Sequence, residues 1–184
     1  MIMVAMRDCQ SLLYEKVDLS DFKFALAVIN IDCSMSNFMW REDVLVEGNY
    51  LWMTTTAGLV RMNLTTNATS LYTSASGLMG TSTMSLTSYT PTGGETTLFI
   101  GHDGAGSERP AVTTIGLSTG TIVGHEFDQL PSNNIDALAS DYWGVHIATD
   151  IGPMTHWNST SSFFENGIPS FQVFGWPVEK MVSD

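Results

Sequence analysis

A short phrase that occurs twice in this 184-residue chain constrains its fold more than any single residue does. Residues 50–59 read Tyr-Leu-Trp-Met-Thr-Thr-Thr-Ala-Gly-Leu, and residues 144–153 read Gly-Val-His-Ile-Ala-Thr-Asp-Ile-Gly-Pro. Each copy is an apolar run followed by a turn that contains a glycine. A repeated unit of this size cannot bury its apolar face alone, so neighbouring copies must stack on one another. The repeat therefore predicts a series of similar units.

The repeat unit is about 43 residues long, because the segment Ile135–Asp141 recurs as Val178–Asp184. The matching segments earlier in the chain are Asp43–Gly48 and Thr83–Ser88, which makes the first unit about 41 residues long and the second about 51. The surplus of the second unit lies in two loops with glycine and proline, at residues 91–95 and 103–110. Insertions of this kind belong in the connections between strands.

Each unit is expected to contain four short strands joined by turns. In the first unit we expect strands at Asp43–Val46, Tyr50–Thr54, Leu59–Met62 and Ser70–Thr73. In the third unit we expect them at Ile135–Ser140, Trp143–Thr149, Pro153–Trp157 and Ser161–Phe164. The second strand is the most apolar in each unit, as expected of a strand packed on both faces. Four strands per unit at this period are typical of β-propeller blades.

The segment from Leu51 to Asn63 also resembles a known repeat. It is similar to the two-component-regulator propeller repeat, in which a Leu-Trp-Ile-Gly-Thr-x-x-Gly-Leu phrase precedes a short apolar strand. Val145–Gly152 is similar too, and the resemblance covers roughly residues 43–184. The first glycine of the phrase is replaced by Thr54 in one copy and Ala148 in the other. The resemblance implies a β-propeller of the kind found in sensory ectodomains of signalling proteins.

We therefore predict an all-β fold of four-stranded antiparallel blades in an incomplete propeller ring. The expected units are residues 43–82, 83–130 and 131–177, with residues 178–184 as the first strand of another blade. Residues 1–42 do not follow the repeat, although Phe22–Asp32 contains a plausible buried strand from the end of a preceding blade. A closed propeller ring contains about 4–8 blades, more than the three complete units expected here. We therefore expect a fragment of a longer protein. Closure of the ring by a second copy of this chain is the less favoured alternative.

The charge of the chain restricts its partners. Asp and Glu outnumber Lys and Arg by 19 to 7, giving a net charge of -12. This charge repels phosphate backbones, so we expect no nucleic-acid partner. No apolar run approaches the roughly 20 residues of a membrane-spanning helix, so we expect no membrane insertion by this segment. The abundant Ser, Thr and Asn are common on extracellular β proteins, so an extracellular or periplasmic location is expected.

Covalent modification stays open at the sequence level. Cys9 and Cys33 either form a disulfide or remain two buried thiols, and we favour the thiols. Three asparagines lie in N-glycosylation motifs, Asn63, Asn67 and Asn158. A chain rich in Thr and Asn contains such motifs by chance, so they give little support to a secreted origin.

The sequence assigns no catalytic residue, no cofactor and no metal site. His146 takes the place of Trp52 in the repeat, so packing or a hydrogen bond at the strand end is its expected role. The tryptophans are expected to pack in or between blades rather than to form a platform for sugar rings. Candidate ligand-binding residues in loops and at strand ends are His102, Asp103, Glu108, His125, Glu126 and Asp150.

These observations favour a non-enzymatic scaffold that presents loops to a ligand or to a protein partner. The sequence does not distinguish a carbohydrate ligand from a protein ligand. The remaining blades of a parent protein, or another copy of this chain, are the other expected partners. The alternative is a fragment of a carbohydrate-active propeller enzyme whose catalytic groups lie partly beyond this chain. A third possibility is a structural array in a secreted adhesive protein.

Overall fold

A computed structural model describes residues 3–7, 11–15, 40–80, 82–103, 111–126, 130, 132–150, 155–158 and 163–165. The chain divides into two compact units, Met1–Met39 and Trp40–Asp184. In the first unit, β1 (Met3–Arg7) and β2 (Ser11–Glu15) form an antiparallel pair. The strand expected within Phe22–Asp32 lies outside the described residues, as do both cysteines.

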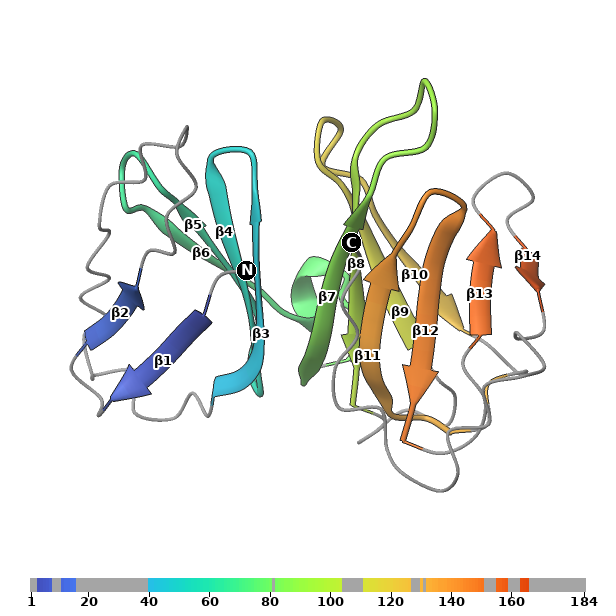
Figure 1. Ribbon diagram of the computed structural model, residues 1–184, viewed down its shortest axis with the longest axis horizontal. Helices are drawn as coiled ribbons and strands as arrows, with labels where there is room; N and C mark the ends of the chain where they lie inside the picture. Colours follow the sequence, from blue (N-terminus) through green and yellow to red (C-terminus); the bar gives the residue numbers. More distant parts are fainter. Residues whose placement is uncertain are drawn as a thin grey trace. The chain divides into compact units, whose positions relative to one another are not determined.

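Within the described part of the second unit, the strands form three antiparallel sheets of four strands each (Figure 1). The first sheet contains β3 (Trp40–Glu47), β4 (Tyr50–Thr55), β5 (Gly58–Asn63) and β6 (Thr69–Tyr72). The second contains β7 (Thr83–Tyr89), β8 (Thr97–His102), β9 (Ala111–Gly116) and β10 (Ile122–Glu126). The third contains β11 (Ile135–Ser140), β12 (Gly144–Thr149), β13 (Thr155–Asn158) and β14 (Phe163–Glu165).

Each sheet follows the chain in simple order, with every strand hydrogen-bonded to the next one in the sequence. This is the meander of a propeller blade, and it confirms the expected all-β class with four antiparallel strands per blade. The strands expected in the first and third units are all present, with ends that differ by up to three residues. A 3-10 turn, η2 (Ser74–Ser76), connects the first sheet to the second.

An irregularity recurs at the same place in the three sheets. The pairing of each first strand with its second strand contains one shift of register. An extra residue in a strand bends it and increases its twist. Because the shift recurs, we regard it as part of the repeat. The shifts lie between Trp40 and Val44, between Thr83 and Ser85, and between Ile135 and Ala137.

The first strands of the three sheets lie next to one another, since β7 contacts both β3 and β11. Hydrogen bonds that involve side chains connect these strands across the sheet boundaries. The backbone N–H of Leu86 on β7 donates to Asp43 Oδ2 on β3 at 2.7 Å. On the other side, Thr87 Oγ1 on β7 donates to Ser140 Oγ on β11 at 3.2 Å. Adjacent first strands are the arrangement expected of consecutive blades in a propeller.

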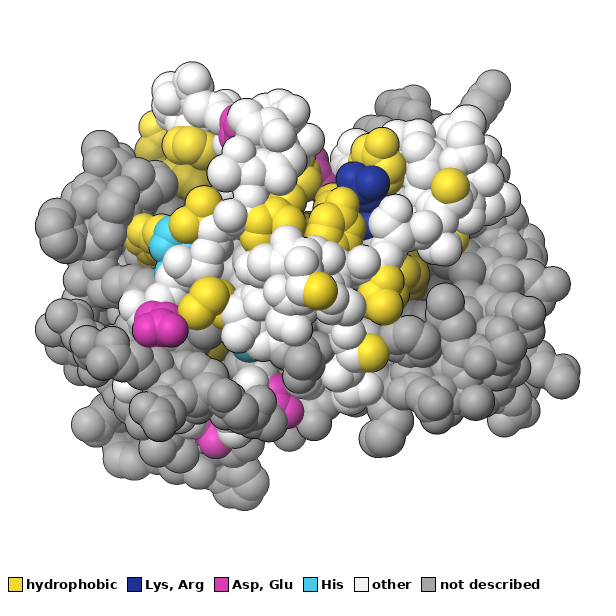
Figure 2. All heavy atoms as spheres, turned by 180° about the vertical axis from the view of Figure 1, so that it is seen from behind, with side chains coloured by type: hydrophobic (Ala, Val, Ile, Leu, Met, Phe, Trp, Pro, Cys, Tyr) yellow, Lys and Arg dark blue, Asp and Glu magenta, His cyan; other side chains and the backbone are white. Residues whose placement is uncertain are grey.

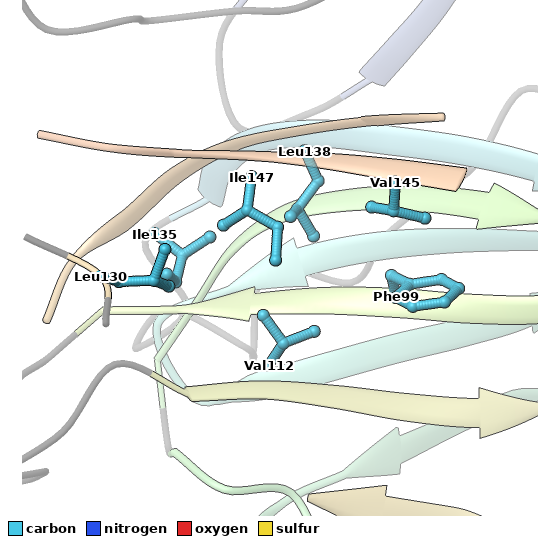
Figure 3. Close-up of a cluster of buried hydrophobic side chains, with 7 residues drawn as sticks. All are labelled: Phe99, Val112, Leu130, Ile135, Leu138, Val145 and Ile147. Carbon is cyan, nitrogen blue, oxygen red and sulfur yellow. The ribbon is translucent and has the colours of Figure 1, made fainter. Parts of the chain in front are cut away.

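The second and third sheets share a hydrophobic core, drawn in Figure 3. Phe99 and Val112 come from the second sheet, and Val145 and Ile147 come from the third. Ile135 and Ile147 are completely buried. A second core contains Trp52 and Leu59 of the first sheet together with Leu98 and Ile100 of the second. Each pair of neighbouring sheets therefore buries a joint apolar layer, as the repeat predicts.

Two glycines allow neighbouring groups to approach the backbone closely. Gly101 on β8 leaves space for Ile135 of the next sheet, because a Cβ atom there would lie 2.6 Å from the Ile135 Cγ2 atom. Gly58, at the turn of the repeated phrase, has a φ of +135°. A Cβ at this position would overlap the Tyr72 carbonyl oxygen of the same sheet. Gly58 thus combines a positive φ with a close approach of backbone, whereas Gly152 of the second copy lies outside the described residues.

The described surface carries few cations. Figure 2 shows acidic side chains scattered over one face among mostly neutral ones. This agrees with the low charged fraction of 14%. Among the described residues, no helix is long and apolar enough to cross a membrane.

Candidate ligand-binding pocket between two sheets

A pocket of about 240 Å³ lies between the second and third sheets. Aromatic groups form much of its wall, and the remaining lining residues are small or aliphatic. The aromatic groups are Tyr89, Phe99, His125 and Trp157. The other lining residues are Pro91, Thr97, Thr114, Val123 and Val145.

The strand register positions the aromatic groups. Phe99 on β8 faces Trp157 on β13, and their rings meet edge to face with centroids 5.2 Å apart. His125 on β10 meets the same indole at 4.7 Å, also edge to face. Such contacts between rings stabilise by about 0.5–1.5 kcal/mol beyond the area they bury. The three rings thus hold one another in place, and the indole packs between two blades as expected from the sequence.

A hydroxyl group fixes the orientation of the His125 ring. Thr114 Oγ1 donates to the Val123 carbonyl at 3.3 Å. The same Oγ1 atom is hydrogen-bonded to His125 Nε2, at 3.0 Å. Burial lowers the pKa of His125, so the ring is neutral at pH 7 and the pocket wall carries no charge there.

His102, another candidate from the sequence, is buried away from this pocket with 2% of its surface exposed. Its Nδ1–H points to the Ser82 carbonyl at 3.3 Å, and its Nε2 lies 2.7 Å from Thr113 Oγ1. The same hydroxyl accepts from the Met79 backbone N–H at 3.0 Å. Burial lowers the pKa of His102 to about 4, against the smaller effect of the Ser82 hydrogen bond. The side chain ties a loop to two strands.

The other sequence candidates are dispersed. Asp103 follows β8, and its backbone N–H donates to the Ser82 carbonyl at 3.3 Å. Glu126 is exposed at the end of β10. Asp150 Oδ2 accepts from Asn134 Nδ2 at 3.2 Å. Glu108 lies outside the described residues. Of the described candidates, only His125 lines the pocket.

Some pocket residues were not predicted from the sequence, namely Phe99, Thr114 and Val145. They occupy ordinary apolar or Thr positions of strands, so composition gives no sign of them. One signal was available for Phe99 and Val145, because both belong to the apolar second strand of their unit. A pocket between two sheets requires their relative placement, which the linear sequence does not contain.

Comparison with known proteins supports the fold. No protein-family model and no curated protein matches this chain. Solved structures do match, and they include two extracellular domains from B. thetaiotaomicron. One is the extracellular domain of BT4673, described as a one-component system, with a TM-score of 0.56 and 14% sequence identity. The match covers 85% of this chain and 19% of the BT4673 chain. The other is the extracellular domain of BT3049, described as a hybrid two-component system, with a TM-score of 0.54 and 16% sequence identity. The match covers 84% of this chain and 20% of the BT3049 chain.

This chain has the fold of a part of those extracellular domains. It spans about a fifth of the length of each. At this level of identity the likeness concerns the arrangement of strands and not the function.

Proposed function

We propose that this chain is a non-enzymatic, ligand-binding part of a β-propeller in the sensory ectodomain of a larger extracellular or periplasmic protein. The resemblance of the Leu51–Asn63 segment to the two-component-regulator propeller repeat supports this proposal. The structural likeness to extracellular domains of one-component and two-component systems also supports it. The remaining blades would lie in other parts of the same protein.

The pocket between the second and third sheets is the observation that carries the ligand-binding part of the proposal. Its volume of about 240 Å³ is below the roughly 300–1,000 Å³ of pockets that enclose a drug-sized ligand. It therefore suits one ring or one side chain of a larger ligand. Aromatic walls with the Thr114 hydroxyl and His125 provide apolar contact and a few directed hydrogen bonds. A sugar ring or an aromatic side chain of a partner protein matches this lining.

The pocket lining favours binding over glycoside hydrolysis. Hydrolysis of a glycosidic bond normally requires two carboxyl groups about 5–10 Å apart. None of the nine described residues that line this pocket is an aspartate or a glutamate. A fragment of a carbohydrate-active enzyme stays the alternative, with its catalytic groups in another part of the protein.

Binding can be measured with a panel of monosaccharides, oligosaccharides and aromatic peptides, using calorimetry on the 184-residue chain. We expect saturable binding of at least one class and no turnover of glycans. Thr114→Val keeps the shape of the side chain and removes the hydroxyl, so it should weaken binding about 5- to 10-fold. His125→Ala should weaken it further, because the ring contact with Trp157 is lost as well.

Trp143→Ala provides the matched control, since this indole is 69% exposed and outside the pocket. Its binding should equal that of the wild-type chain. If Thr114→Val and His125→Ala bind the ligand as the wild type does, the pocket is not the site. Turnover of a glycan that is abolished by replacing one carboxylate would contradict the non-enzymatic function.

A further inference from the structure

Three side chains with metal-ligating atoms converge in the third sheet, away from the pocket described above. They are Asp141, His146 and His156, and their ligating atoms lie within 4.8 Å of one another. The three residues are separated by up to fifteen positions in the sequence, without the short spacing of a known metal motif. Strand pairing brings them together.

The register of the sheet places the two imidazoles side by side. His146 on β12 is the direct cross-strand partner of His156 on β13. Their ring centroids are 4.7 Å apart, with an angle of 38° between the planes. Cross-strand neighbours on one face have Cβ atoms about 4.5–5.5 Å apart, so both rings extend on the same side of the sheet. Both side chains are largely buried, at 17% and 13% exposed.

The turn between β11 and β12 presents the carboxylate to these rings. Asp141 Oδ1 accepts from the backbone N–H groups of Trp143 and Gly144, at 2.7 and 3.0 Å. These bonds hold the carboxylate, so that Oδ2 lies 2.8 Å from His146 Nε2.

Gly144, at the end of this turn, leaves space for the His156 ring. A Cβ at Gly144 would overlap the Trp157 carbonyl oxygen and lie 3.1 Å from His156 Nε2. With no side chain at this position, the His156 ring lies beside the turn and 3.9 Å from Asp141 Oδ1. A larger residue would separate β13 from the turn, and with it the ring from the carboxylate.

The distances agree with those of a first-row transition metal. Zn²⁺ binds imidazole nitrogen and carboxylate oxygen at about 2.0–2.2 Å, so neighbouring ligand atoms in a tetrahedral site are roughly 3.3 Å apart. The two nitrogen–oxygen distances, 2.8 and 3.9 Å, lie on either side of this value. Small rotations of the side chains would thus bring the three groups into position around one ion.

We propose that Asp141, His146 and His156 form a binding site for a divalent transition-metal ion of the Zn²⁺ class. Imidazole ligands select such ions over Mg²⁺ and Ca²⁺, which prefer oxygen. Three protein ligands leave a fourth position for water or for a group from a partner. Tyr142 and Trp143, which are 78% and 69% exposed, follow Asp141 in the same turn. The site does not depend on the function proposed for the pocket.

The surroundings also predict the strength of binding. A ligating imidazole usually donates its second N–H to a carboxylate or carbonyl, and loss of that partner weakens metal binding about 10- to 100-fold. Among the described residues, the buried His146 Nδ1 has no hydrogen-bond partner. We therefore expect reversible binding that is about 10- to 100-fold weaker than in a site with a complete outer shell.

Zinc chloride added to the 184-residue chain provides the first test, with the histidine ring nitrogens observed by NMR. The wild-type chain contains four histidines, so two ring signals should shift and two should stay. We expect His146 and His156 to respond, with His102 and His125 unchanged. No response up to millimolar zinc, or a response of His102 or His125 instead, would overturn the site.

Calorimetry of variants provides the second test, in a Cys9→Ser, Cys33→Ser background that removes the thiols as ligands. His146→Ala and His156→Ala should each weaken zinc binding more than ~100-fold, exceeding the loss of an outer-shell partner. Asp141→Asn keeps both turn hydrogen bonds and removes one ligand charge, so it tests the carboxylate in a folded chain. Glu126→Gln, at an exposed position at the end of β10, is the control and should bind zinc like the background. Equal binding by all four variants would refute the proposal.

Discussion

Gly58 is a residue whose identity is required by the backbone around it. It has a φ of +135°, and a Cβ atom there would overlap the Tyr72 carbonyl oxygen on the paired strand. We expect Gly58→Ala to lower the free energy of unfolding by roughly 2–4 kcal/mol, because the strained φ and the backbone overlap add together. Urea unfolding followed by circular dichroism would measure this loss.

Gly48→Ala is the appropriate comparison for this substitution. Gly48 also has a positive φ, at +57°, but an added Cβ would meet no atom within 4 Å. Its cost should stay near 1 kcal/mol, the usual penalty for a residue other than glycine in the left-handed region. Equal losses in the two variants would mean that the overlap with Tyr72 is relieved by a small movement.

His102 is expected to make stability depend on pH. Its pKa is about 4 in the folded chain, lowered by burial from an ordinary value of about 6.5. Above pH 6.5 the ring is neutral in both the folded and the unfolded chain. As the pH falls from 6.5 to 4, the unfolded chain takes up a proton that the folded chain does not. Stability should therefore decrease over this range, by about 3 kcal/mol in total.

The difference between the wild type and His102→Gln isolates this contribution from the titration of carboxylates. The variant should lose less stability between pH 6.5 and 4 than the wild type does, in urea unfolding at several pH values. Direct titration of the His102 ring by NMR provides a second measurement. A midpoint near 6.5 would contradict the effect of burial.

The hydrogen bond of His146 was predictable from the sequence, whereas its neighbour His156 was not. Its place in the repeat predicts packing or a hydrogen bond at the strand end, and the bond to Asp141 confirms this. The approach of His156 was not predictable from the spacing. It follows from the cross-strand register, which is set by the whole hairpin.

At the scale of elements, the turn between β4 and β5 is tied to β7 by a buried threonine. Thr83 Oγ1 accepts from the Thr55 N–H at 2.9 Å and lies 2.9 Å from the Gly58 carbonyl oxygen, to which it donates. Thr83→Val has nearly the same shape but leaves the buried Thr55 N–H without a partner. We expect a loss of about 1–3 kcal/mol in the free energy of unfolding, measured by urea unfolding.

Thr87→Val is the same change on the same strand. The Thr87 hydroxyl donates to Ser140 Oγ at 3.2 Å, in a partly buried position. Because Ser140 can turn toward water when this bond is lost, the cost should be below about 1 kcal/mol. A larger loss for Thr87→Val than for Thr83→Val would show that the tie between the first two sheets is the weaker one.

The strands themselves were largely predictable. From alternating apolar residues and turn residues, the ends of β4 and β5 were predicted to within one residue of those observed. The predicted bounds of β11 equal the observed ones. The weaker predictions concern outer strands such as β13 and β14, where fewer apolar residues mark the element. The register shift in the first pair of each sheet left no mark in the sequence, because a bulge depends on the pairing of two strands.

For the whole molecule, the shared core predicts that neighbouring sheets unfold together. Ile135 on β11 is completely buried and packs over Gly101 of the second sheet. Ile135→Ala removes a large side chain from this boundary and should cost about 2–5 kcal/mol. Hydrogen exchange measured by mass spectrometry should increase in both the second and the third sheet.

Val123→Ala is the control for this change, since Val123 is 44% exposed on β10. We expect it to cost less than about 1 kcal/mol and to leave exchange in the third sheet unchanged. If Ile135→Ala increases exchange only in β11–β14, the two sheets unfold as separate units.

By itself, the sequence determined the class of the fold, the number of strands per unit, the glycine at the turn and the acidic character of the chain. These properties depend on local periodicity, turn chemistry and composition, all of which are present in the linear order of residues. The pocket around Trp157 and the Asp141–His146–His156 cluster were decided by the tertiary structure. Both depend on which strands pair, in which register, and on which sheets share a core. Contacts between residues distant in the chain set these features, and no local pattern records them.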